Sequence, residues 1–215
     1  MNDYGLVYIA EKYSAVIVDS SALELHKPFK GSREAYDRIK DHVGKFGIAH
    51  SPHESIEYMI AVRDAFRRGF MVTSGVAEEC GMRYRGLKRA RDHDVGERAR
   101  IEHEKSLQRL AMRHVIKLSE NEETQRQKMR TYFSDFGDGV SETDFDLIIT
   151  GLAIAVSRGS TAILTNDIPL MRRFKAIRRR VNSLEYLSSG LTYLANSLDA
   201  YVMVGGCGFQ RVAPF

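Results

Sequence analysis

Acidic side chains occur in this 215-residue chain at four points close to short apolar runs. Asp19 directly follows the β-branched run 15–18, and Asp167 comes two positions after a second such run. A glutamate and an aspartate stand near the starts of two predicted helices. Because loops converge at the carboxyl ends of parallel strands, we expect one pocket to receive all four carboxylates. These are Asp19, Glu79, Asp144 and Asp167.

Carboxylates crowded into one pocket repel one another, and at neutral pH some would hold protons unless a cation joined them. Oxygen-rich sites suit Mg²⁺ or Mn²⁺, which keep several waters and share the phosphate oxygens of a substrate. Such an ion lowers the pKa of an attacking water and stabilises charge on the attacked phosphate. Two ions about 4 Å apart can serve both the attacking and the leaving oxygens. The pattern therefore predicts hydrolysis of phosphodiester bonds.

Each of the four acids also has a purely structural interpretation. Asp19 and Asp167 could cap a turn or a helix after a strand. The segment from Ser141 to Asp144 resembles a capping box. Glu79 could complement the dipole near a helix N-terminus. It is the coincidence of all four that favours a catalytic site.

Two of the acids have a nearby competitor. Asp144 and Asp146 stand two residues apart on a predicted helix, so they point about 200° away from each other and cannot both enter one site. Asp144 shares its face with apolar residues such as Leu147 and is favoured, while Asp146 remains the alternative metal ligand. Glu78 and Glu79 differ by only about 100°, which does not separate them.

The elements that would position these acids alternate along the chain. Strands separated by helices indicate parallel βαβ units, hence an α/β fold in which helices sandwich a mainly parallel sheet. After residue 204 no pattern is visible. Strands are predicted at 15–18, 70–73, 114–118, 162–165 and 201–204. Helices are predicted at 32–46, 54–68, 120–133, 142–157 and 171–180, with one or two long exposed helices over 77–113.

Length and composition indicate one ordinary globular domain over residues 1–215, with 43% hydrophobic and 28% charged residues. The N-terminus lacks a secretory pattern. The longest apolar stretch, 147–156, is far shorter than the roughly 20 residues of a membrane span. Two cysteines cannot build a disulfide framework. We therefore expect a cytoplasmic protein.

The basic residues are clustered, in a chain whose net charge is +4 and whose pI is near 9.0. Clusters of this kind are natural phosphate-binding surfaces, although a solvated helix face would have the same composition. The residues predicted to bind the nucleic-acid backbone are Arg83, Arg85, Lys88, Arg89, Arg172, Arg173 and Lys175.

The ordered set of acidic motifs resembles the PIN-domain family of nucleases over roughly residues 14–204. The resemblance implies a three-layer α/β/α sandwich, dependence on Mg²⁺ or Mn²⁺, and cleavage of single-stranded or structured RNA, with endonucleolytic and exonucleolytic cutting both open. It favours Glu79 over Glu78, gives Ser21 a role in positioning water at the metal, and keeps Asp146 as a reserve ligand. The matching segments are Val18-Asp19-Ser20-Ser21, Val76-Ala77-Glu78-Glu79, Ser141-Glu142-Thr143-Asp144 and Thr165-Asn166-Asp167.

Many members of this family are shorter toxins of toxin–antitoxin pairs, and the basic helical segment 82–113 departs from their compact form. An inhibitor protein and a homodimer remain open as partners besides RNA. The competing hypothesis is a non-catalytic PIN-like module that binds RNA or protein through its basic helices. A DNA nuclease is a third alternative, because phosphate contacts alone do not distinguish the sugars.

Overall fold

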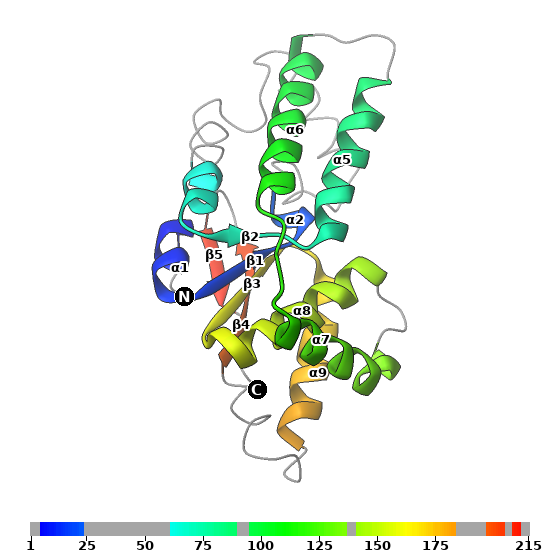
Figure 1. Ribbon diagram of the computed structural model, residues 1–215. Helices are drawn as coiled ribbons and strands as arrows, with labels where there is room; N and C mark the ends of the chain where they lie inside the picture. The colour runs from blue at the N-terminus through cyan, green and yellow to red at the C-terminus, as the bar shows by residue number, and fades with distance from the viewer. Residues whose placement is uncertain are drawn as a thin grey trace.

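The computed structural model describes residues 5–23, 61–89, 95–136, 141–183, 197–204 and 208–211. Within these ranges helices separate the first four strands, and several helices follow one another between the second and the third strand (Figure 1). The helix predicted at 32–46 and the first residues of the one predicted at 54–68 lie outside them, whereas residues 61–67 are helical. Gly69 ends that helix with a φ of 103°, which glycine adopts without steric cost. None of the described helices is long and apolar enough to cross a membrane.

A five-stranded sheet forms the centre of the fold, with the strand order β2-β1-β3-β4-β5. The first four of these strands are parallel, and β5 runs antiparallel to β4. The α/β class and the mainly parallel sheet are therefore confirmed. The strands are β1 (Ala15–Val18), β2 (Phe70–Met71), β3 (Thr161–Thr165), β4 (Leu198–Val204) and β5 (Gly208–Arg211).

Both faces of the sheet are covered. Every residue of β1 and β3 is buried, and successive side chains of a strand point to opposite faces. Such continuous burial is typical of parallel strands enclosed by helices, and it is compatible with the predicted three layers. The helices are α1 (Leu6–Lys12), α2 (Ser20–Leu23), α5 (Ser74–Lys88), α6 (Val95–Arg113), α7 (Glu120–Tyr132), α8 (Glu142–Arg158) and α9 (Ile168–Ser183).

The apolar helix α8 packs on β1, β3 and β4, and α7 packs on α8. Helices α5 and α6 lie side by side and extend away from the sheet as a hairpin (Figure 1). Hydroxyl side chains cap three helices, and each satisfies a backbone N–H that the first turn leaves without a partner. The caps are Thr73 for α5, Ser119 for α7 and Ser141 for α8.

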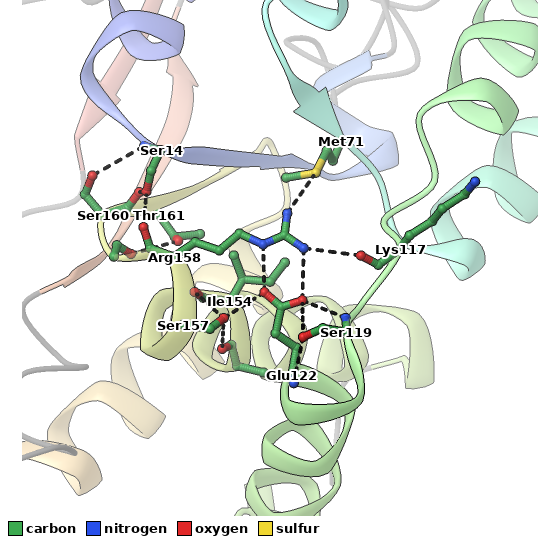
Figure 2. Close-up of polar contacts among 12 residues, drawn as sticks. Ser14, Met71, Lys117, Ser119, Glu122, Ile154, Ser157, Arg158, Ser160 and Thr161 are labelled. Atoms are coloured by element: carbon green, nitrogen blue, oxygen red, sulfur yellow. Dashed lines mark hydrogen bonds and ion pairs between the residues drawn. The ribbon is translucent and has the colours of Figure 1, made fainter.

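An ion pair between the buried Glu122 and the partly exposed Arg158 fastens α7 to α8 (Figure 2). Arg158 donates from Nε to Glu122 Oε1 at 2.7 Å and from Nη2 to Glu122 Oε2 at 3.0 Å. Ser157 Oγ and the Ser119 N–H donate to the same carboxylate at 2.7 and 2.8 Å. The Arg158 hydrogen bonds are the main cause that lowers the pKa of Glu122 to about 2. The network holds the C-terminal end of α8 against the first turn of α7.

Two sequence predictions were wrong. No strand forms at 114–118; Val115 makes only an isolated bridge to Val72, since residues up to Arg113 belong to α6 and α7 begins at Glu120. Conversely, the C-terminal residues without visible pattern include β5. These residues form a strand because they pair with β4, and the local sequence pattern does not predict that pairing.

Candidate functional site

Asp19 directly follows β1 and is buried, with 3% of its surface exposed. Its Oδ2 accepts hydrogen bonds from Ser21 Oγ and, at 2.8 Å, from Thr165 Oγ1. Burying a charged carboxylate costs free energy unless hydrogen bonds or a cation replace the lost contacts with water. The two hydroxyls thus hold the Asp19 carboxylate in one orientation at the carboxyl edge of the sheet.

The same hydroxyls connect the ends of β1 and β3. Thr165 Oγ1 accepts from the Asp167 N–H at 2.9 Å, and Ser21 Oγ accepts from the Asn166 N–H at 2.8 Å. Ser21, predicted to position water, is 2% exposed and acts on the Asp19 carboxylate. The sequence pattern does not mark Thr165 itself as a site residue, although Thr165 belongs to the motif Thr165-Asn166-Asp167. Nothing in its type alone distinguishes a threonine of a buried strand from a site residue.

Asp167 caps α9, since its Oδ1 accepts from the Leu170 N–H at 3.1 Å. The alternative interpretation of Asp167 as a helix cap is therefore confirmed. The cap occupies one oxygen of the carboxylate, and the residue stands directly beside the Asn166 link to Ser21. Capping and participation in a site are compatible for Asp167.

Asp144 lies in the first turn of α8, half-buried, and its pKa is raised above the ordinary value. Burial is the largest cause, and the charges of Asp19, Asp167 and Glu79 add to the rise in pKa, against a hydrogen bond with Ser141. Asp19, Glu79 and Asp167 therefore lie close enough to Asp144 for their charges to act on its carboxyl group. Glu79 is half-buried on α5, whereas Glu78 is exposed.

Asp146, the alternative ligand, lies on a different face of α8. Its carboxylate is paired with Arg126 and, at 3.4 Å, with Arg130, both on α7. The reason is the one used to separate the two aspartates: residues two apart on a helix point in nearly opposite directions. The Asp146 carboxylate is thus held by α7, and its role as the reserve metal ligand stays a prediction.

Arg83, predicted to bind nucleic acid, makes contacts within the protein. Its Nε donates to Glu104 Oε2 at 3.4 Å, and its Nη1 donates to the Ser20 carbonyl at 3.4 Å. Glu104 is buried on α6, so this pair sits inside the protein. Arg83 thus ties the hairpin to α2, next to Asp19, and its predicted role in binding nucleic acid remains untested.

The other predicted basic contacts lie on two helices. Arg85 and Lys88 are exposed on α5, and Arg89 is exposed at its C-terminal cap. On α9, Arg172 is exposed, while Arg173 and Lys175 are half-buried. The opposite face of α9 is apolar and buried, with Leu170, Met171, Phe174 and Ile177. The role of these side chains in binding nucleic acid stays a prediction.

The donor set fits a hard divalent cation. Carboxylate and hydroxyl oxygens are the ligands that Mg²⁺ and Mn²⁺ prefer, and mutual repulsion among the acids is what such an ion relieves. Among the described residues, no three His, Cys, Asp or Glu side chains gather closely enough to be recognised as a metal site. The acids are thus within electrostatic range of one another without forming a finished coordination shell.

Comparison with known proteins adds no family assignment. No family model matches this chain, and neither a curated protein nor a solved structure matches it significantly. The motifs and the geometry of the acids are therefore what a functional proposal rests on.

Replacing Asp144 with asparagine is expected to stabilise the metal-free protein at neutral pH. Because the pKa of Asp144 is raised, the folded state binds more protons than the unfolded one above about pH 4, so stability falls as pH rises through that window. Asparagine cannot ionise, so the Asp144→Asn variant does not lose this stability as the pH rises. Thermal unfolding in EDTA should show a higher midpoint at pH 7.5, by roughly 2–4 °C per kcal/mol relieved.

Asp146→Asn is the matched control on the same helix. It removes ion pairs to Arg126 and Arg130 and should lower the midpoint. If both substitutions lowered the midpoint equally at pH 7.5, the acids would not repel one another as inferred.

Proposed function

We propose that this chain is a divalent-metal-dependent nuclease of the PIN type that hydrolyses phosphodiester bonds of RNA. The supporting observation is that Asp19, Glu79 and Asp167, from three other segments, lie close enough to Asp144 for their charges to raise its pKa. A three-layer sandwich, a single domain over residues 1–215 and a cytoplasmic location belong to the same proposal.

Asp19, Asp144 and Asp167 would hold the ion, which is Mg²⁺ or Mn²⁺. When bound, it supplies charge stabilisation for the attacked phosphate and a lower pKa for the attacking water. Carboxylates are suited to this role only if they are held in place before the substrate arrives. The hydrogen bonds from Ser21 and Thr165 to Asp19 provide that support at the strand ends.

Glu79 completes the set or orients the attacking water. It reaches the acids from α5, a different element from those that carry the other three. Because Asp144 is half-buried and surrounded by negative charge, its carboxylate gains most from a neighbouring cation. The remaining exposed basic residues of α5 and α9 would hold the phosphates of the RNA backbone, since salt-sensitive contacts of this kind supply much of the affinity for nucleic acids.

The proposal is tested by incubating the purified protein with labelled RNA and labelled DNA, each with Mg²⁺ or Mn²⁺ and each with EDTA. We expect RNA to be cleaved with the metal and to stay intact with EDTA. Cleavage of DNA alone would make the substrate DNA. Absence of cleavage, together with absence of Mn²⁺ binding in calorimetry, would favour the non-catalytic module, in which the acids serve only as helix caps.

A further inference from the structure

We propose that Gly75 is a positioning residue that lets the start of α8 approach α5 closely enough to place Asp144 beside Glu79. The inference rests on the proposed function, because the pair Glu79 and Asp144 belongs to the proposed metal site. It concerns a residue that takes no direct part in the chemistry, and it explains why a glycine occupies this place in a helix.

A side chain at Gly75 would collide with the side chain of Thr143. A Cβ atom built there would lie 2.9 Å from Thr143 Cγ2 and 3.2 Å from Thr143 Oγ1. Carbon atoms pack best at about 3.5–4.0 Å, so the first of these contacts is a clash. Because Gly75 has no side chain, the Thr143 side chain in the first turn of α8 packs directly against the backbone of the first turn of α5.

The contact lies next to the two acids. Gly75 and Glu79 are four residues apart on α5 and therefore occupy the same face of that helix. Thr143 immediately precedes Asp144 in the first turn of α8. Any displacement that a larger residue at Gly75 forces on α8 is thus transmitted within one helical turn to both carboxylates.

Backbone conformation does not explain the glycine. The described glycines with positive φ are Gly69 and Gly159, so Gly75 has an ordinary helical conformation. In a helix, glycine is less favourable than alanine by roughly 1 kcal/mol. Gly86, on the same helix, provides the contrast, because a Cβ there would meet nothing within 4 Å.

The experiment measures the affinity for Mn²⁺ by titration calorimetry in four proteins, with thermal unfolding recorded for each. These are the unaltered chain, Gly75→Ala, Gly86→Ala and the double variant Gly75→Ala/Thr143→Ala. We expect Gly75→Ala to weaken Mn²⁺ binding by about tenfold or more, the usual effect of disturbing the support of a metal ligand. Gly86→Ala should bind Mn²⁺ as the unaltered chain does. The double variant should recover most of the affinity, because alanine at position 143 lacks the two threonine atoms, Cγ2 and Oγ1, that lie too close to the new Cβ.

The outcomes separate the two proposals. If the unaltered chain binds no Mn²⁺, the proposed function fails and this inference with it. If it binds Mn²⁺ and Gly75→Ala binds equally well, only the inference is overturned. Should Gly75→Ala fail to fold, the double variant decides: recovery of folding and of Mn²⁺ binding supports the close contact, and failure to recover refutes it.

Discussion

Replacing Asp19 with asparagine is expected to abolish metal-dependent cleavage of RNA while the protein stays folded. The change removes the negative charge and keeps an oxygen that can accept the hydrogen bonds from Ser21 and Thr165. A divalent ion contributes several kcal/mol of charge stabilisation to such a reaction, and each 1.36 kcal/mol is a factor of ten in rate. The expected loss is therefore about a thousandfold or more, measured as the single-turnover cleavage rate at saturating Mg²⁺.

Asp64→Asn serves as the control, since that side chain is 45% exposed and its carboxylate is paired only with its helix neighbour Arg67 among the described residues. It should cleave RNA at the unaltered rate. Circular dichroism and the thermal midpoint establish that both variants are folded. A cleavage rate for Asp19→Asn within a few-fold of the unaltered chain would remove Asp19 from the site, and with it the central premise of the proposed function.

Arg158→Met is expected to cause the largest loss of stability. It leaves the carboxylate of Glu122, only 4% exposed, without the cation that binds it through two hydrogen bonds (Figure 2). Breaking a buried pair by removing one partner costs about 3–5 kcal/mol. Arg158 is 34% exposed, so we expect the low end, about 3 kcal/mol, or roughly 6–12 °C in the unfolding midpoint.

Two further variants identify the cause. Glu123→Gln removes a more exposed ion pair with Arg126 and should cost about 1 kcal/mol or less. Glu122→Gln/Arg158→Met should be less destabilised than Arg158→Met, because no charge is left buried. The pKa of Glu122 is lowered to about 2, so its stabilising contribution is present above the ordinary glutamate pKa and is lost as pH falls towards 2. The difference between Arg158→Met and the unaltered chain should therefore shrink in acid; a constant difference would contradict the ion-pair explanation.

Local sequence patterns predicted the elements that depend on short-range order. The buried run 15–18 became β1, and the helices predicted from residues 120 and 142 begin at those residues, where Ser119 and Ser141 provide the caps. Helix periodicity also separated Asp144 from Asp146, because side-chain direction along a helix follows from position alone. The order of the four acids, and their place after strands or at helix starts, could be read in the same way.

Tertiary structure decided the rest, because it depends on partners far away in the chain. Strand β5 exists through pairing with β4, and Val115 contributes no more than a bridge. Arg83 looks in the sequence like any exposed basic residue, and only the buried Glu104 on another helix turns it inward. The hydroxyl of Thr165 and the missing side chain of Gly75 matter through what lies opposite them, Asp19 and Thr143. A residue's type records its own chemistry and local conformational preference, whereas its distance from a remote neighbour arises only when the whole core packs.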